Sequence, residues 1–153
     1  MKRLDRKEIA QWLTGAEQAA PVYLVGIGGC GMSGLAHLLL DAGFAVYGSD
    51  LRENPGICQL RERGAEIFIG HAPEQLRTAR PDLVVYSSAI RTDNPELTVA
   101  EQQGLPMVRR AVLLAALTHQ RRSICIAGMH GKTTTTALLA HALEALGTDP
   151  GFA

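Results

Sequence analysis

Two glycine-rich loops are the parts of this sequence best suited to chemistry. The first contains G-x-G-x-x-G at Gly26, Gly28 and Gly31, directly after an apolar run and before a helical stretch. In such a loop the first glycine permits a tight turn, the second lets the backbone approach a diphosphate, and the third lets helix and strand pack closely. Free N–H groups and the positive end of the helix attract phosphate. The spacing therefore predicts a diphosphate site.

An acidic residue follows the second apolar run. Asp50 stands nineteen residues after Gly31, where a carboxylate can accept hydrogen bonds from ribose hydroxyls. Taken alone, this pattern is typical of an NAD(P)-binding oxidoreductase domain. Glycines that serve only a turn are a weaker alternative, and a non-catalytic nucleotide-binding module is another, because the motif does not name the nucleotide.

The second loop, residues 128–136, reads GMHGKTTTT and follows the apolar run 123–127. A strand, a Gly-Lys-Thr loop and a helix wrap nucleotide phosphates: backbone N–H groups cradle them and Lys132 reaches the β/γ oxygens. The strict P-loop pattern G-x-x-x-x-G-K-[ST] is not met, because Ile126 stands five residues before Gly131. The shorter form still predicts phosphate binding.

Four consecutive threonines begin the helix after this loop. β-Branched threonines are poor helix formers, so their hydroxyls are expected to serve a ligand or a metal. Thr133 is the Mg²⁺ ligand expected by position, and Thr134 is the next candidate. A plain helix-capping role is the alternative.

Short apolar runs alternate with helical stretches along the chain, which is typical of parallel strands covered by helices. Strands are expected at 22–25, 45–47, 66–69, 83–86, 106–108 and 123–127. Helices are expected at 4–13, 31–42, 55–63, 74–79, 95–103, 109–118 and 132–146. Glycines expected to stop helices stand at 43, 64, 104 and 147. The alternation predicts an α/β fold: a Rossmann-like, doubly wound parallel sheet with helices on both faces.

A polar stretch at 119–122 separates a long helix from the next apolar run, so it is the expected domain boundary. Residues 1–119 are then expected to form one domain. Residues 120–153 are expected to supply the first strand, P-loop and helix of a second, truncated α/β domain.

Composition excludes several classes of function. Among 153 residues, 15 Lys and Arg balance 15 Asp and Glu, which argues against nucleic acid as a partner. No apolar run approaches the roughly 18 residues that span a bilayer, and the charged start lacks a signal peptide, so a cytoplasmic protein without membrane contacts is expected. Three cysteines without CxxC spacing fit neither a disulfide framework nor a zinc site, and burial is the expectation for each.

Together these motifs resemble the Mur ligase family, the ATP-dependent amide-forming enzymes of peptidoglycan synthesis, and within it the alanine-adding branch. The resemblance is carried, in chain order, by residues 26–34, 48–51, 87–90 with 94–96, 109–110 and 128–135. It implies that the first domain binds the UDP part of UDP-N-acetylmuramate. The implied diphosphate contacts are Gly28, Gly29, Cys30, Gly31, Met32 and Ser33.

The resemblance also implies a reaction. ATP would phosphorylate the lactyl carboxylate of the sugar, and the amino group of L-alanine would attack the acyl phosphate. Lys132 would stabilise charge on the transferring group, with Mg²⁺ on the phosphate oxygens. The implied ATP contacts are Gly128, Met129, His130, Gly131, Lys132, Thr133 and Thr134. His130 matches the alanine-adding branch, whereas Met129 replaces the usual Thr. The L-alanine site would lie outside this chain, which is then expected to bind UDP-sugar without ligating.

Five further positions have competing interpretations. His71 follows the third expected strand, so a uridine contact is slightly favoured over a surface histidine. Ser87 and Ser88 follow the fourth and either bind substrate or form a turn. Asn94 is expected to cap a helix that begins at the next residue. Arg109 either meets a phosphate or carboxylate or lies at a solvated helix end.

Overall fold

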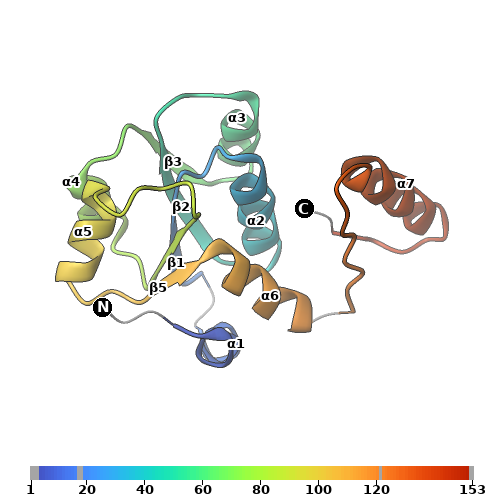
Figure 1. The fold of residues 1–153 in the computed structure, drawn as a ribbon, viewed down its shortest axis with the longest axis horizontal. Coiled ribbons are helices and arrows are strands. Elements are labelled where there is room, and N and C mark those ends of the chain that lie inside the picture. The colour runs from blue at the N-terminus through green and yellow to red at the C-terminus, as the bar shows by residue number, and fades with distance from the viewer. Residues whose placement is uncertain (1–3, 17–18, 121, 152–153) are drawn as a thin grey trace.

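The computed structural model describes residues 4–16, 19–120 and 122–151. Its centre is a five-stranded parallel sheet in the order β3-β2-β1-β4-β5 (Figure 1). The strands are β1 (Pro21–Val25), β2 (Ala45–Asp50), β3 (Glu66–Ile69), β4 (Leu83–Tyr86) and β5 (Met107–Arg109). The doubly wound α/β fold predicted from the sequence is confirmed.

Helices cover both faces of this sheet. They are α1 (Arg6–Gly15), α2 (Cys30–Asp41), α3 (Pro55–Glu62), α4 (Pro73–Ala79), α5 (Pro95–Gln102), α6 (Arg110–Gln120) and α7 (Lys132–Ala145). In β1, Val22 and Leu24 pack with α1, α2, α3 and α6, while Tyr23 and Val25 pack with α4 and α5. Because successive side chains of a strand point to opposite faces, one continuous apolar strand serves both layers.

Helix boundaries follow the capping signals in the sequence. Asn54 and Asn94 accept hydrogen bonds from first-turn N–H groups, and each is followed by a proline at the first helical position. The predicted glycine stops at 43, 64, 104 and 147 all have positive φ, from +67° to +94°, the conformation that ends a helix without a β-carbon clash.

Helix α1 packs against α6. Ile9 and Leu13 join the main core, and the Leu4 N–H donates to the Met107 carbonyl at 3.0 Å. An Asp5–Glu8 capping box begins the helix. The opening amphipathic helix thus closes one side of the core, as its pattern indicates.

The prediction of a strand at 123–127 is wrong. No regular structure forms over residues 122–128, which run as an extended segment to α7 (Figure 1). A strand needs a neighbour to complete its ladder, and the described part of the chain offers none there. Helix α7 itself buries no residue.

The expected burial of the cysteines is also wrong, because Cys30, Cys58 and Cys125 are all exposed. Cys30 begins α2 at the first loop, Cys58 lies on α3, and Cys125 belongs to the extended segment. Each stands where the element turns toward solvent, which composition alone does not reveal.

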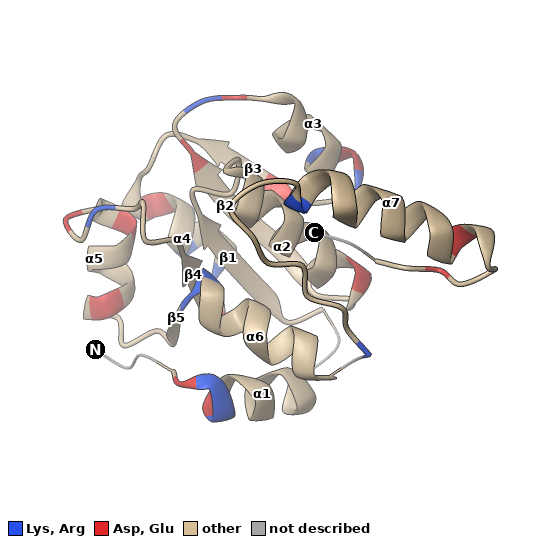
Figure 2. Cartoon of the chain, turned by 45° about the vertical axis from the view of Figure 1, so that its right-hand side comes forward, with Lys and Arg blue, Asp and Glu red and all other residues tan. Residues whose placement is uncertain are grey.

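The order of the strands places a topological switch between β1 and β4, because the chain moves outward from β1 to β3 and then returns to β4. Ligands of open α/β sheets bind at the carboxyl ends of the strands at such a point. The loops after β1 and β4 therefore flank the expected binding site. Acidic and basic residues are interspersed around it (Figure 2), and no helix of the described residues is long and apolar enough to cross a bilayer.

Candidate functional site

The first glycine loop is fastened to β2. Gly26 has a φ of +77° and makes the tight turn, as predicted. The N–H groups of Gly26 and Ile27 donate to the Ser49 carbonyl at 2.8 and 3.0 Å. The turn at the end of β1 is therefore held by the neighbouring strand before any ligand arrives.

Gly28 contacts two side chains that the motif did not predict. Its N–H donates to Asp50 Oδ2 at 2.8 Å, and its carbonyl accepts from Asn54 Nδ2 at 3.1 Å. A β-carbon built on Gly28 would lie 2.7 Å from Asn54 Nδ2 and 2.9 Å from Asp50 Oδ2. A side chain at this position would therefore clash with Asn54 and Asp50, and the diphosphate contact of Gly28 stays a prediction.

Gly31 also differs from expectation. A β-carbon there would lie 2.7 Å from Arg110 Nη1, so this glycine makes room for a guanidinium from the start of α6 and not for a strand. Within residues 4–16, 19–120 and 122–151, Arg110 forms no ion pair. The Arg110 guanidinium, which has no carboxylate partner there, therefore lies beside the positive N-terminal end of α2.

Backbone donors narrow the predicted phosphate contacts. The N–H groups of Met32 and Ser33 donate to the Gly29 carbonyl at 2.8 Å, and that of Gly29 donates to Gly26. Cys30 and Gly31 are the first two residues of α2, and Gly29 caps the helix without a side-chain hydrogen bond. The first-turn N–H groups of Cys30 and Gly31 are therefore the donors left for a ligand.

The loop after β4 forms a turn. The Ala89 N–H donates to Ser87 Oγ and the Ile90 N–H to the Ser87 carbonyl, each at 3.2 Å, while Ser88 is exposed. This geometry supports the turn interpretation of the serine pair, and their substrate contacts stay a prediction. Arg109 is exposed at the end of β5, which matches the solvated alternative.

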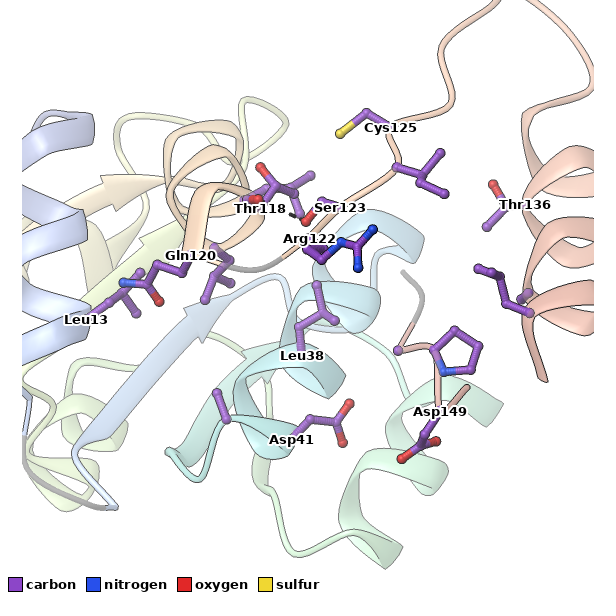
Figure 3. Close-up of a pocket in the computed structure, with 18 of the residues that line it drawn as sticks. Leu13, Leu38, Asp41, Thr118, Gln120, Arg122, Ser123, Cys125, Thr136 and Asp149 are labelled. Carbon is purple, nitrogen blue, oxygen red and sulfur yellow. Dashed lines mark hydrogen bonds between the residues drawn. The ribbon is translucent and has the colours of Figure 1, made fainter. Parts of the chain in front are cut away.

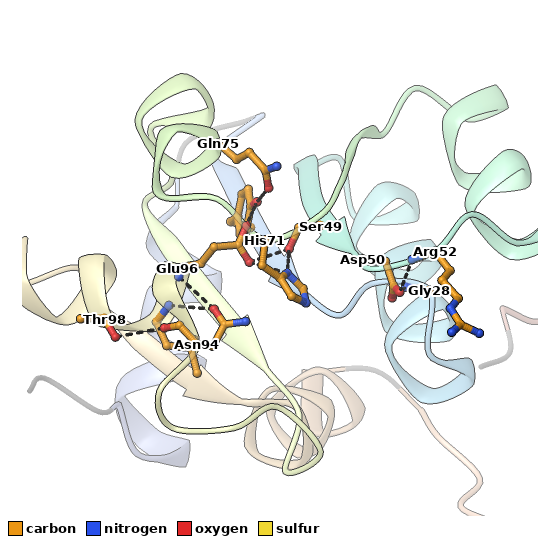
Figure 4. A network of polar contacts seen from close by, with 11 residues as sticks. Gly28, Ser49, Asp50, Arg52, His71, Gln75, Asn94, Glu96 and Thr98 are labelled. Carbon is orange, nitrogen blue, oxygen red and sulfur yellow. Dashed lines mark hydrogen bonds and ion pairs between the residues drawn. The ribbon is translucent and has the colours of Figure 1, made fainter.

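A buried polar network lies beside the loop (Figure 4). Glu96, in the first turn of α5, has no exposed surface, and neither has Ser49. The Glu96 carboxylate accepts hydrogen bonds from Tyr23 Oη and Ser49 Oγ, each at 2.6 Å. One of its oxygens lies 2.9 Å from His71 Nδ1. Gln75, with its amide nitrogen facing the cluster, donates to Glu96 Oε1 at 2.8 Å. His71 is thus tied to the carboxyl edge, with 12% of its side chain exposed.

The sequence interpretation identified His71 but assigned Glu96 only to a helix start. One signal was available: Tyr23 stands in the middle of the central buried strand, and a buried phenol needs a hydrogen-bond partner. Burial, together with the hydrogen bond to Glu96 and the charge of its carboxylate, raises the pKa of Tyr23 far above its usual range. Tyr23 is therefore a neutral donor.

The second glycine loop stands free of the sheet. Gly131 caps α7 with a φ of +78° and no side-chain hydrogen bond, and residues 127–135 are exposed. Lys132 Nζ donates to the Gly128 carbonyl at 2.6 Å. Open first-turn N–H groups, a folded-back lysine and the adjacent hydroxyls of Thr133 and Thr134 fit a polyphosphate chemically.

Metal ligands are sparse near this loop. Among the residues described, no group of three or more His, Cys, Asp or Glu side chains could hold a metal ion. Predicted Mg²⁺ contacts in this chain therefore rest on the hydroxyls of Thr133 and Thr134.

A pocket separates α7 from the sheet domain (Figure 3). Leu38 and Asp41 line it from the carboxyl-terminal half of α2, Thr118 from α6 and Thr136 from α7. The first glycine loop meets the opposite end of α2, about 12–16 Å from these two residues along the helix axis. This pocket is therefore separate from the candidate diphosphate site.

Comparison with known proteins gives consistent results. Residues 21–122 match the model of the Mur ligase family, catalytic domain. The chain is 48% identical over 130 residues to a UDP-N-acetylmuramate–L-alanine ligase of Hyphomonas neptunium and 52% identical over 129 residues to one of Chelativorans sp.. These matches cover 85% and 84% of this chain but 27% of each relative.

A solved structure agrees with these sequence matches. UDP-N-acetylmuramate-alanine ligase MurC of Thermotoga maritima superposes with a TM-score of 0.79 and 36% identity, over 85% of this chain and 30% of that protein. The chain therefore spans just over a quarter of the length of its curated relatives.

Proposed function

Because the chain belongs to the Mur ligase family, we propose that it is the UDP-substrate-binding part of a UDP-N-acetylmuramate:L-alanine ligase, an ATP-dependent enzyme of peptidoglycan synthesis. Residues 1–119 bind UDP-N-acetylmuramate, and residues 120–153 begin the central ATP-binding domain. The site for L-alanine lies outside this chain, so the chain alone binds its substrate without joining it to an amino acid. The proposed enzyme acts in the cytoplasm without a membrane partner. The balanced charge supports the absence of a nucleic-acid partner.

The observation that carries this proposal is the shared place of Arg110 and the start of α2. Arg110 Nη1 approaches Gly31 so closely that a β-carbon would lie 2.7 Å away, beside the open N–H groups of the first turn. A diphosphate placed there receives backbone hydrogen bonds and a guanidinium together. Neutral overall charge is compatible with this, because binding needs no extended basic surface.

The Asp50 carboxylate is shared between the first glycine loop and the place expected for a ribose. In a dinucleotide-binding domain this carboxylate is free for the ribose hydroxyls, whereas here Oδ2 accepts from the Gly28 N–H at 2.8 Å. Oδ1 receives only a 3.4 Å contact from the Arg52 N–H, so one oxygen remains for a ribose. Asp50 thus both closes the loop and offers a single acceptor to the nucleoside.

The second loop would hold the phosphates of ATP with Mg²⁺. ATP supplies the phosphoryl group that activates the sugar carboxylate. Lys132 is placed to stabilise phosphate charge, and Gly128, Met129, His130 and Gly131 supply backbone around it, with Thr133 and Thr134 available to Mg²⁺. Because the lysine contacts backbone carbonyl oxygens of its own loop, phosphate oxygens would replace those acceptors. Met129 is 89% exposed. This methionine lacks the hydroxyl of the threonine usual in the family, but its backbone N–H is still available to a phosphate.

Isothermal titration calorimetry of the chain with UDP-N-acetylmuramate tests the proposal. We expect saturable heat that free UDP competes away, no heat with NADH, and no ADP release when ATP and L-alanine are added. Circular dichroism establishes that the sample is folded. No heat with folded protein would contradict the proposal, and heat with NADH alone would restore the oxidoreductase interpretation.

A further inference from the structure

The buried carboxylate of Glu96 lies against one ring nitrogen of His71. Glu96 Oε1 accepts from Tyr23 Oη, and Oε2 accepts from Ser49 Oγ. The single hydroxyl hydrogen of Ser49 is used in that bond. His71 Nδ1 lies 2.9 Å from Glu96 Oε2 and 2.8 Å from Ser49 Oγ. Both neighbours present lone pairs, so Nδ1 must donate.

This arrangement fixes the chemistry of the other ring nitrogen. In a neutral imidazole with its proton on Nδ1, Nε2 is a hydrogen-bond acceptor. Tyr86 Oη is the buried side-chain atom that lacks a hydrogen bond among the described residues, and no partner of His71 Nε2 occurs in that part of the chain. Since Nε2 is not among the buried unpaired atoms, it is open to solvent. Figure 4 shows the ring held from its Nδ1 side.

The network lies next to the residue expected to contact the ribose. Ser49 and Asp50 are consecutive and point to opposite faces of the sheet: Asp50 binds Gly28 of the loop, while Ser49 binds Glu96. Figure 4 shows the two sets of contacts on either side of β2. The Gly70 N–H donates to the Asp50 carbonyl at 2.8 Å, which holds His71 beside the position expected for the ribose.

Resting on the proposed function, we infer that Glu96 is a positioning residue that makes His71 Nε2 an acceptor for the imide N–H of uracil. Uracil carries a hydrogen on ring nitrogen N3, whereas the same nitrogen of cytosine carries a lone pair. An acceptor facing that nitrogen binds the first base and repels the second. Discrimination between UDP and CDP would thus be set by a carboxylate that touches neither ligand.

The test compares UDP and CDP binding by calorimetry, using the chain at pH 8. The wild type is expected to prefer UDP by about tenfold or more, because the wrong base leaves two acceptors face to face. In Glu96→Gln the side-chain amide can donate to Nδ1 and move the ring proton to Nε2. Its preference is expected to fall to about threefold or less.

Tyr23→Phe is the matched control. It removes one hydrogen bond to the same carboxylate but leaves Oε2 facing His71, so the preference for UDP should remain. A merely structural role of Glu96 would lower UDP and CDP binding together and leave their ratio unchanged in Glu96→Gln. That result, with UDP still bound by the wild type, overturns the inference while leaving the proposed function in place. Absence of UDP binding by the folded wild type instead counts against the proposed function and removes the base on which the inference rests.

Proton-detected ¹⁵N spectra of the wild type give a second measurement that needs no folded variant. They report which nitrogen of His71 carries hydrogen, and we expect Nδ1 alone at pH 8. A proton on Nε2, either alone or with Nδ1, overturns the inference.

Discussion

The two glycine loops of this chain share a backbone signature and differ in their surroundings. The first is fixed by the Ser49 carbonyl, by the Asp50 carboxylate and by Asn54. The second leads into a helix that buries no residue, and the Lys132 ammonium group donates to carbonyl oxygens of its own loop. The first loop is held in place by contacts with other elements, whereas the second is held by contacts within the loop itself.

A glycine motif therefore specifies a local backbone shape, whereas contacts from neighbouring elements determine whether that shape forms a binding site. Gly26 and Gly131 have nearly the same φ, +77° and +78°. Ile90 lies over the first, but nothing lies within 4 Å of a β-carbon on the second.

Hydrogen exchange should show the largest difference. Amides of β1, in the middle of the sheet, should exchange at least about a thousandfold more slowly than amides of α7, because the core opens only with the whole domain and an uncovered helix of this length is marginal. Mass spectrometry of exchange in peptic fragments measures this. Equal protection of both segments would mean that α7 is packed and would remove the contrast.

Alanine substitutions at the paired glycines should separate strain from coupling. Gly26→Ala is expected to lower the free energy of unfolding by about 1–3 kcal/mol, because it places a β-carbon at positive φ and 2.8 Å from Ile90 Cδ1. Gly131→Ala carries the same strain in a segment that is not coupled to the core, so the main transition should change by less than about 0.5 kcal/mol. Urea unfolding followed by circular dichroism provides both values, and similar losses in the two variants would count against the comparison.

Neighbouring arginines should differ in UDP binding. Arg110→Gln is expected to weaken binding about tenfold, because a charge-assisted hydrogen bond to the diphosphate is lost. Arg109→Gln removes the same charge from an exposed strand end and should change the affinity less than about twofold. Calorimetric titration with UDP at constant ionic strength compares them, and equal effects would show that only overall charge matters.

The smallest expected effect concerns the phenol in β1. Tyr23→Phe should lower stability by about 1 kcal/mol at neutral pH, since it removes a hydrogen bond to the buried carboxylate. The pKa of Tyr23 is raised in the folded state, so the folded protein favours the neutral phenol. Its contribution is full below the unfolded-state pKa of about 10 and is lost as pH rises above that value. Unfolding curves from pH 7 to 11 should converge for the two proteins; a constant difference would contradict this.

Much of the fold follows from the sequence because the signals are local. Asparagine caps before proline, glycine stops and apolar runs such as β4 identify each element of the sheet domain. The run at 123–127 has the same apolar character and forms no strand. Strand formation depends on a neighbouring strand, which no local pattern contains.

The candidate site was less predictable, because its decisive contacts join residues far apart in the chain. Gly31 meets Arg110 from α6, and Ser49 meets Glu96 from α5. The sequence offered Arg109 as a contact for a phosphate or carboxylate, but the side chain that lies against the loop is that of Arg110. Alternation along a strand and the exact start of the next helix decide which of two adjacent arginines turns inward, and these details follow from packing.

The extended segment before α7 also affects how the protein behaves at high concentration. Residues 124–127 read Ile-Cys-Ile-Ala, a β-prone stretch outside the sheet, and Ile124, Leu138 and Leu146 are largely exposed. An exposed β-prone stretch can pair with the same stretch of another copy. We therefore expect self-association through residues 124–127 as the protein is concentrated.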